Sequence, residues 1–561
     1  MLILRNLLQR LRREDGFTMM LVVGTMAVVV VVVGVVLSDV QGDFKPGRKD
    51  EDRKVAYAAA EAGIADYQAR LESNPSYWAQ CVDANNPSLG QVGTKNFVSM
   101  PGSSAQYAIE LLPTTGHTSC STSDASSMVS SAGEFRIRVT GRPRAGDTST
   151  QRQIIATFRP KGFLNYIYYT DYETLDPKLY SFVTKGATTT STSQGDYLTW
   201  ATNNCGTTRW PARGSLSWSG KFGATNTTAG CSEIQFAPND KVSGPFHTND
   251  SIMVCEQPSF GRNPGDAVEV AGGTPGWRSA GGSCSSSTRP KVNSLPGYSA
   301  AINTAVGTWQ LASQRDFPPS NASLHDDATS NYRFKGPTTI VLNGANMTVT
   351  GKREDGTVLT NQSMSIPEGV VYVSDDPAAG SCGGLQPLAP YNGSASGTAA
   401  GNAACGDLFI SGSYSQNVTF ASGNDIVVTG NVARSSDAWM LGLIPDKFAR
   451  VYHPVNRSGT SCSDGTGEMQ NVTIDAAILA LTHSFTVDAY ECGNKLGTLT
   501  VRGAIAQKYR GPVGTGGTTG TGYTKDYQYD QRLALRSPPR FMNPVQPAWA
   551  LANRTEQIPV S

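Results

Sequence analysis

Ten cysteines are the residues whose type and spacing point most directly to chemistry. Their number is even and no C-x-x-C motif occurs, which argues against a zinc site and favours disulfide bonds in an oxidising compartment. The competing interpretation is a set of buried free thiols in a cytosolic protein. The ten are Cys81, Cys120, Cys205, Cys231, Cys255, Cys284, Cys382, Cys405, Cys462 and Cys492.

The expected disulfides pair neighbouring cysteines in chain order, because short loops between stacked coils bring near neighbours together. A loop of about 25 residues closed in this way stabilises a fold by roughly 3 kcal/mol in the chain-entropy model. Sequence alone leaves other connectivities open. The expected pairs are Cys81–Cys120, Cys205–Cys231, Cys255–Cys284, Cys382–Cys405 and Cys462–Cys492.

Acid–base chemistry would need carboxylates or imidazoles brought together, and the sequence does not place its candidates together. The acids near predicted strands are Asp425, Asp475 and Asp488. The histidines beside β segments, where a hydrogen-bonded structural role is expected, are His247, His453 and His483. No H-E-x-x-H, G-x-S-x-G, Walker A or EF-hand pattern occurs. We therefore expect no enzymatic activity, and we predict no metal site and no cofactor.

The composition indicates which elements must position these residues. A chain of 561 residues with 39% apolar content can form two or three domains with real cores. Its 46 basic and 45 acidic residues give a net charge of +1, so no global field draws it to nucleic acid and no nucleic-acid partner is predicted. With 59 glycines and 31 prolines, the chain is typical of a mainly β fold with many turns.

An uncharged apolar segment, residues 17–37, departs from this pattern and is long enough to cross a bilayer as a helix of about 20 residues. Four arginines precede it, and Asp39 and Asp43 follow it. The positive-inside rule then predicts a single-pass protein of the inner (cytoplasmic) membrane with a short cytoplasmic N-terminus and an extracytoplasmic C-terminal domain. An ordinary signal peptide is disfavoured, because residues 38–41 offer no A-x-A cleavage pattern.

The junction before this segment reads Arg13-Glu14-Asp15-Gly16-Phe17-Thr18. A charged leader followed by Gly, Phe and a long apolar helix resembles the leader junction of type IV prepilins. The resemblance implies a leader over residues 1–16, cleavage between Gly16 and Phe17 by a prepilin peptidase, and N-methylation of Phe17. It also implies that the helix anchors the subunit in the membrane before assembly and packs inside a filament afterwards.

A second helical stretch, "RKVAYAAAEAGIADYQARL", follows a break predicted at Gly42 and Pro46-Gly47. Its "AAEAGI" core resembles the segment after the membrane helix in minor pilus assembly proteins of the PilX type, so the pilin-like helix is expected over 17–73. The helical spacing predicts that small residues form a seam for close packing. The seam residues are Ala58, Ala62, Ala65 and Ala69.

Residues 74–228 are expected to form a β-rich pilin-like or connector module, with strands at "QYAIELL", "EFRIRVTGR" and "RQIIATFRP". The aromatic run between Phe163 and Tyr172 predicts strand packing, and stacking on carbohydrate is the alternative.

Residues 229–510 carry short apolar triplets between small polar turns, a pattern that favours a right-handed parallel β-helix, or β-solenoid. A β-sandwich with long insertions is the alternative, because the period is irregular. A helix or helical hairpin is predicted around 296–317, and 511–561 is expected to form a flexible loop and a Pro-rich, aromatic tail along the solenoid. The clearest triplets lie at 339–342, 347–349, 369–373, 408–410, 418–420, 426–428, 472–474, 485–487 and 499–501.

The sequence thus predicts a non-enzymatic minor pilin or pseudopilin that acts in assembly or at the tip of a type IV pilus-like filament and displays a solenoid for adhesion or interaction. Major pilins carry a glutamate at the fifth mature residue, and here that filament position is Leu21, which lacks the usual acid. The expected partners are a prepilin peptidase, other pilins of a filament or initiating complex, and a cell-surface glycan or protein. The alternative is a membrane-anchored, polysaccharide-binding or polysaccharide-cleaving β-helix protein.

Overall fold

The computed structural model describes residues 17–557, apart from 75, 131–133, 180–191, 223–224, 239, 263–265, 273–275, 281–283, 285–287, 289, 293–309, 313, 383–401, 459–460, 516–519, 535 and 546–547. The fold is mainly β and divides into two compact units. Unit 1 comprises Met1–Pro160 and Ala548–Ser561, and unit 2 comprises Lys161–Pro547. Unit 2 is therefore an insertion into the chain of unit 1.

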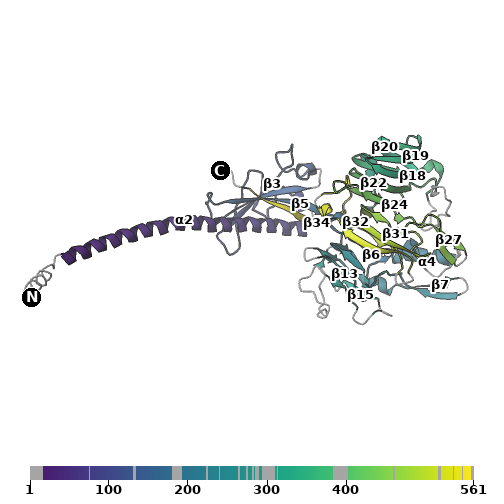
Figure 1. Ribbon diagram of the computed structural model, residues 1–561, viewed down its shortest axis with the longest axis horizontal. Coiled ribbons are helices and arrows are strands. Elements are labelled where there is room, and N and C mark those ends of the chain that lie inside the picture. The colour runs from purple at the N-terminus through teal and green to yellow at the C-terminus, as the bar shows by residue number, and fades with distance from the viewer. Residues whose placement is uncertain are drawn as a thin grey trace, which may run out of the picture. The chain divides into compact units, whose positions relative to one another are not determined.

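Unit 1 begins with helix α2, Phe17–Ser73, which runs without interruption (Figure 1). The predicted break at Gly42 and Pro46-Gly47 is wrong, since the helix continues through all three residues. A proline removes one backbone hydrogen bond and bends a helix, but neighbouring turns can carry the helix past it. In the described part of the chain, no helix meets the combination of length and apolarity that a membrane span requires.

The C-terminal part of α2 packs on a sheet with the order β1-β3-β4-β5-β34. Strands β3, β4 and β5 pair antiparallel, and they form where alternating apolar residues were predicted. The short β2 pairs with β3 at the side of this path. The bounds are β1 Leu89–Gln91, β2 Val98–Ser99, β3 Gln106–Leu112, β4 Phe135–Arg142, β5 Arg152–Lys161 and β34 Ala548–Gln557.

The predicted alanine seam of α2 does not face this sheet. Ala58, Ala65 and Ala69 are exposed and Ala62 is half-buried. The buried face instead carries Ala56, Ala59, Ala60, Gly63, Ile64, Tyr67 and Leu71, because the large apolar side chains decide which side of the helix turns to the core. A Cβ on Gly141 of β4 would lie 2.0 Å from the carbonyl oxygen of Ala56, so helix and strand touch backbone to backbone.

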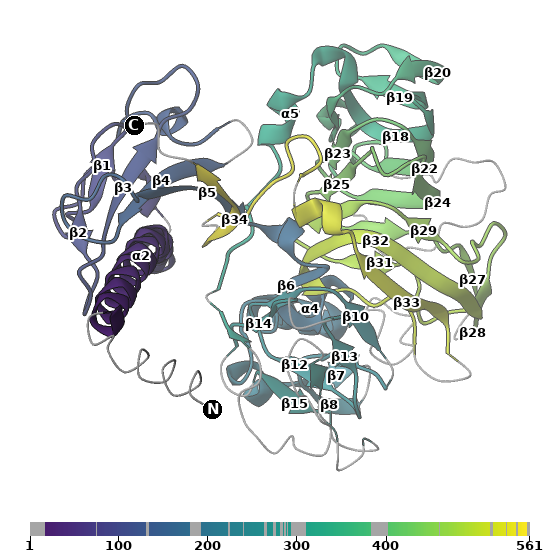
Figure 2. The ribbon, with the colours of Figure 1, turned by 60° about the vertical axis from the view of Figure 1, so that its left-hand side comes forward.

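Unit 2 is built around a sheet in which 21 described strands are linked, nearly all of them in parallel pairs (Figure 2). Its first strands are β6 Tyr168–Leu175, β10 Lys241–Ser243, β11 Phe246–Thr248, β13 Ser259–Phe260, β14 Val268–Val270, β16 Lys291–Val292 and β17 Gln310–Leu311. The later strands are β18 Arg333–Gly344, β19 Asn346–Arg353, β20 Val358–Ser365, β21 Gly369–Ser374, β22 Leu408–Tyr414, β23 Val418–Ser422, β24 Ile426–Arg434, β25 Leu441–Pro445, β26 Ala449–Val451, β29 Thr473–Ile474, β30 Ala477–Ala480, β31 Phe485–Val487, β32 Lys495–Arg510 and β33 Gly522–Tyr529.

Smaller elements surround this sheet in unit 2. Strands β9, Gln235–Phe236, β12, Ile252–Val254, and β15, Trp277–Ser279, form a separate parallel sheet. Two hairpins, two α-helices and several short 3-10 helices are also among the described elements of unit 2. The hairpins and α-helices are β7 Trp218–Phe222 with β8 Thr225–Ala229, β27 Val455–Ser458 with β28 Ser461–Asp464, α4 Thr192–Asn204 and α5 Ser323–Asp327.

The parallel strands of unit 2 stack in register, so equivalent apolar residues form columns. Ile410, Val428, Val451 and Val487 are mutual partners along β22, β24, β26 and β31, and all four are buried. A single triplet cannot bury a face, but successive strands about 4.8 Å apart cover one another's side chains. This explains why eight of the nine predicted segments fall wholly within strands, and why the ninth, 472–474, has its last two residues in β29.

The order of strands is not the order of the chain. Strand β6 pairs with β32 on one side, through Tyr168 and Ile505, and with β11 on the other, through Tyr168 and Phe246. Residues 161–228, assigned from the sequence to the connector module, thus belong to unit 2. The reason is a pairing between strands more than three hundred residues apart, which local patterning does not encode.

Two further segments differ from their sequence assignment. Of the helix predicted around 296–317, residues 296–309 and 313 lie outside the described residues, and Gln310–Leu311 form β17, which pairs with β14. The expected loop and tail over 511–561 contain β33 and β34. The Pro-rich part of that tail packs on unit 2, where Phe541 is buried and Thr419 donates a hydrogen bond to the Pro539 carbonyl.

The aromatic run belongs to the core, as predicted for strand packing. Phe163, Tyr166, Tyr168 and Tyr169 are at most 4% exposed. Tyr168 stacks on Phe246 with ring centroids 5.4 Å apart. With these rings buried, the carbohydrate-stacking alternative has no exposed aromatic surface at these four positions.

Candidate functional site

Two of the residues expected to function in export and filament packing lie on α2. Phe17 is its first residue and Leu21 lies one turn further, but the described side chains do not include either of them. Gly16 lies outside the described residues.

The five disulfides join Cys81 to Cys120, Cys205 to Cys231, Cys255 to Cys284, Cys382 to Cys405 and Cys462 to Cys492, which are the pairs expected from chain order.

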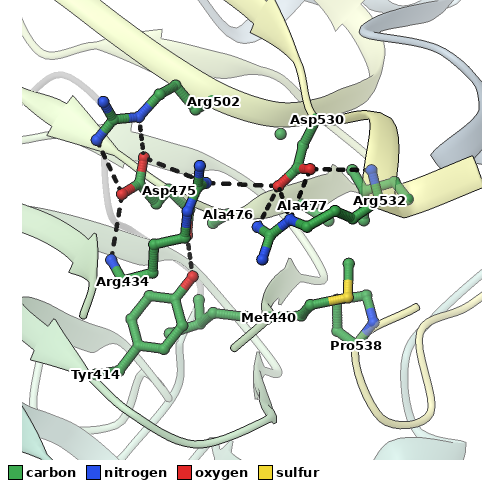
Figure 3. Close-up of a pocket in the computed structure, with 13 residues that line it drawn as sticks. Tyr414, Arg434, Met440, Asp475, Ala476, Ala477, Arg502, Asp530, Arg532 and Pro538 are labelled. Carbon is green, nitrogen blue, oxygen red and sulfur yellow. Dashed lines mark hydrogen bonds and ion pairs between the residues drawn. The ribbon is translucent and has the colours of Figure 1, made fainter. Parts of the chain in front are cut away.

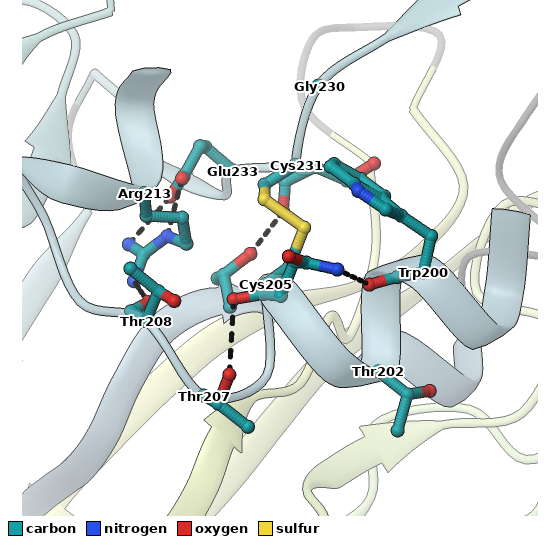
Figure 4. The surroundings of a disulfide bond; sticks show 12 residues. Trp200, Thr202, Cys205, Thr207, Thr208, Arg213, Gly230, Cys231 and Glu233 are labelled. Atoms are coloured by element: carbon teal, nitrogen blue, oxygen red, sulfur yellow. Dashed lines mark hydrogen bonds and ion pairs between the residues drawn. A yellow bond between two sulfur atoms is a disulfide. The ribbon is translucent and has the colours of Figure 1, made fainter. Parts of the chain in front are cut away.

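The bond between Cys205 and Cys231 shows how these disulfides act locally (Figure 4). It fastens the C-terminal end of α4 to the segment after β8. Beside it, the Tyr197 hydroxyl donates to the Gly230 carbonyl at 2.8 Å, and Arg213 is paired with Glu233 at 2.7 Å. The disulfide, the hydrogen bond and the ion pair thus hold the same buried cluster together. These surroundings indicate a structural role for the disulfide.

The three candidate acids do not form one site. Asp425 and Asp488 both bind Arg450, with contacts of 2.9 and 2.8 Å, and all three side chains are buried. Asp475 lies in a different cluster, where Arg502 holds it. Two carboxylates that share one buried arginine belong to a structural ion-pair network, in which the guanidinium is the cationic partner of both.

Asp407 completes the first cluster and was not identified from the sequence. Its Oδ1 accepts hydrogen bonds from the Asn424 side chain and from the backbone amide of Asp425 at 3.2 Å. Its Oδ2 is buried and has no hydrogen-bond partner within the described residues. Burial and the nearby charge of Asp425 raise the pKa of Asp407 to about 6. Its only sequence signal was the position before the strand that begins at Leu408.

The three histidines have separate structural surroundings. His247 is buried between Glu269 and Asn249, with both contacts at 3.0 Å. His453 bonds to the backbone carbonyl of Asp488 at 3.0 Å and His483 to Asp176 at 3.0 Å. The three histidines thus lie in three separate hydrogen-bonded surroundings. Each has the hydrogen-bonded role expected from the sequence.

A surface pocket with about 210 Å³ of empty space, part of it open to solvent, is lined by five charged side chains (Figure 3). Arg502 of β32 holds Asp475 with two contacts, 2.6 and 3.0 Å. Arg532, in the short 3-10 helix Gln531–Ala534, holds Asp530 in the same manner, with Nε 2.8 Å from Oδ1. Arg434 of β24 lies between them, 3.4 Å from Asp530 and 3.8 Å from Asp475.

Arginines hold both carboxylates of this pocket. Burial opposes ionisation of Asp530, but the hydrogen bonds from Arg532 prevail and lower its pKa. The hydrogen bond to Asp475 raises the pKa of Arg502, which therefore stays charged. A general acid needs a proton near neutral pH, which the lowered pKa of Asp530 does not favour. Arg502, 42% exposed, can still offer its guanidinium to a polar ligand.

No cation site accompanies these clusters. Within the residues that the structure describes, no group of three or more His, Cys, Asp or Glu side chains could hold a metal ion.

The likeness of this chain to known proteins is structural. No protein-family model and no curated protein matches the chain. The chain is similar to the crystal structure of the competence-associated pilin ComZ from Thermus thermophilus, with 12% identity and a TM-score of 0.31 over 90% of this chain and 97% of that chain. A TM-score of this size is too low to support a conclusion about function.

Proposed function

We propose that this chain is a minor subunit of a type IV pilus-like filament, of the PilX type, that acts in assembly or at the filament tip. The observation that carries the proposal is a Gly-Phe junction, Gly16-Phe17, followed directly by one continuous helix from Phe17 to Ser73. The C-terminal part of that helix packs on a sheet and contributes to the core of unit 1, whereas its N-terminal part is apolar and exposed.

The proposed location follows from the apolar half of this helix. Residues 17–37 carry no charge and are flanked by arginines on the N-terminal side, which supports membrane insertion with a cytoplasmic N-terminus. The side chains described between Val22 and Val32 have no covering partner in the monomer, and those valines are more than half exposed. A lipid bilayer, and afterwards neighbouring filament subunits, would cover this surface.

The large parallel sheet of unit 2 is proposed to be a right-handed β-solenoid that is displayed outside the cell. In-register columns such as Ile410, Val428, Val451 and Val487 support stacked coils. They do not favour a β-sandwich, whose strands pair antiparallel. The proposed partners of this unit are a cell-surface glycan or a protein.

A low copy number follows from Leu21. In a major pilin, a glutamate at the equivalent position can neutralise the N-terminal ammonium of a neighbouring subunit inside the apolar filament core. An unpaired buried ammonium costs several kcal/mol, so a subunit without the acid is poorly suited to receive another N-terminus. A subunit at the end of the filament or in an initiating complex does not have to accept the N-terminus of another subunit.

A non-enzymatic role is proposed because the acids that could catalyse polysaccharide cleavage are engaged elsewhere. Asp425 and Asp488 share Arg450, and Asp475 is held by Arg502. Glycoside hydrolysis needs one carboxylic acid that keeps its proton and one free carboxylate across an accessible groove.

The test is the mature N-terminus of the chain recovered from membranes. Mass spectrometry should find N-methylated Phe17 as the first residue, and Gly16→Trp should leave the full-length precursor. Thr18→Ser is the control, because it changes a neighbouring residue and keeps the junction. A mature chain that starts at Met1, or after residue 37, would refute the proposal.

A further inference from the structure

The hairpin of β27 and β28 leaves the large sheet of unit 2 between β26 and β29 (Figure 2). Its base is closed by a hydrogen bond of 2.8 Å, which the Gly465 amide donates to the Pro454 carbonyl. The disulfide between Cys462 and Cys492 ties β28 to the segment between β31 and β32. The hairpin is thus a lateral extension of the sheet that is fastened at its base.

His453 lies directly before this hairpin, and its side chain is fully buried. Its Nδ1 is 3.0 Å from the backbone carbonyl oxygen of Asp488, and its Nε2 is 3.1 Å from Oδ1 of Asp464. The Asp464 carboxylate also accepts from the backbone and side-chain amides of Asn494, at 3.0 and 2.7 Å, and such hydrogen bonds favour the ionised carboxylate. Both ring nitrogens of His453 therefore face oxygens that accept.

The number of hydrogens on the ring decides how many of these contacts it can satisfy. A neutral imidazole has one N–H donor and one acceptor nitrogen, whereas the protonated ring has two donors. Only the protonated ring of His453 can make both hydrogen bonds. When the ring is neutral, the lone pair of one nitrogen faces the lone pairs of an oxygen, so one contact is lost. Histidine in general titrates near pH 6.5, within the range in which proteins work.

We infer that His453 is a pH-sensitive switch that holds the base of the β27–β28 hairpin closed when its ring is protonated and opens it when the ring is neutral. Loss of the contact to Asp464 frees the end of β28, and loss of the contact to Asp488 frees the chain that enters β27. Either tautomer of the neutral ring thus opens the base, while the disulfide keeps the hairpin attached. The switch is independent of the proposed role in a filament.

The charged groups packed around His453 have separate partners. Asp464 of β28 makes the ion pair with the ring. Asp488 contacts the ring through its carbonyl, whereas its carboxylate binds Arg450 of β26, which also binds Asp425. Burial raises the pKa of Asp488, and the charges of Arg450 and His453 oppose this rise. A proton that leaves His453 therefore changes the hairpin contact and leaves the ion pairs of Arg450 in place.

The test compares hydrogen–deuterium exchange of the full-length chain at about pH 5.5 and about pH 8, corrected for the intrinsic pH dependence of exchange. The amides of β27 and β28 should be at least about tenfold less protected at the higher pH, because a charged hydrogen bond is lost. His453→Gln should show the weaker protection at both pH values, since its side chain stays neutral. Asp464→Asn should also remove the pH dependence, because its amide can accept from the protonated ring or donate to the neutral one.

His325→Gln is the matched control, because His325 lies on α5 and contacts Asp326 and Glu354, which do not belong to the hairpin. It should keep the pH dependence of the wild type. Equal protection of the wild-type hairpin at both pH values would overturn the inference, and so would a pH dependence that persists in His453→Gln. If His453→Gln fails to fold, an unchanged pH dependence in Asp464→Asn overturns it.

Discussion

Replacing Asp407 by asparagine should make unit 2 more stable at neutral pH. Burial and the charge of Asp425 raise the pKa of Asp407 from 3.8 to about 6, so the folded state binds this proton more tightly than the unfolded state does. A shift of about two units corresponds to roughly 3 kcal/mol of destabilisation once the group is ionised in both states. Asparagine keeps an acceptor for Asn424 and for the Asp425 amide but loses the stronger hydrogen bonds of a charge, so the expected net gain is about 1–2 kcal/mol.

The pH dependence gives the sign of this effect. Because the folded pKa is the higher one, the stability of the wild type should fall as pH rises from 3.8 to about 6 and then level off, and Asp407→Asn should remove that part of the fall. Urea unfolding of unit 2 in the full-length chain, followed at pH 7 and pH 4, measures both quantities. The advantage of the variant should be present at pH 7 and should have largely disappeared at pH 4.

The neighbouring acid provides a contrast within the same cluster. Asp425 accepts from the Phe448 amide and pairs with the buried Arg450, which keeps Asp488 as a second partner, so Asp425→Asn should destabilise by about 1–3 kcal/mol. The reasoning is refuted if Asp407→Asn lowers stability at pH 7, or if its difference from the wild type is the same at both pH values.

Three further predictions concern unit 1 and the filament. Gly141→Ala should destabilise unit 1 by about 1–3 kcal/mol in thermal unfolding, because its Cβ would meet the Ala56 carbonyl, whereas Gly47→Ala, with no atom within 4 Å, should not. Replacing both Cys81 and Cys120 by alanine should cost about 2–4 kcal/mol, and peptide mapping without reductant should recover this pair from the wild type; a different partner for Cys81 would contradict the pairing. Immunogold labelling of sheared filaments should mark ends only, and continuous labelling of the shaft would rule out the tip position.

The strands were predictable from the sequence because their signal is local. Segments such as residues 408–410 and 426–428 combine β-branched residues with small polar turns, and each forms a strand where it stands. The pairing of Tyr168 with Ile505 was not predictable, since nothing within a few residues of either strand specifies a partner that distant. The sequence therefore indicated where these strands lie, but it did not indicate that β6 pairs with β32 in the large sheet.

The same limit applies to side chains. Alanine spacing indicated a seam through Ala58 and Ala65, but the face that packs is chosen by the larger Ile64 and Tyr67. Asp425 and Asp488 were identified as acids near strands, whereas their shared partner Arg450 and the neighbouring Asp407 depend on the stacking of distant strands. A single isolated aspartate has no pattern from which a raised pKa could be inferred.

The insertion of unit 2 between β5 and β34 gives the chain an order of completion. Strand β34 closes the edge of the unit 1 sheet beside β5, and its Trp549 packs edge-on against Phe135 with ring centroids 4.7 Å apart. Ribosomes deliver this strand only after residues 161–547 have been made, and domains generally fold in the order of synthesis. The core of unit 1 thus keeps a vacant position for Trp549 until the whole insertion has been translated, and a chain that stops within the insertion can never fill it.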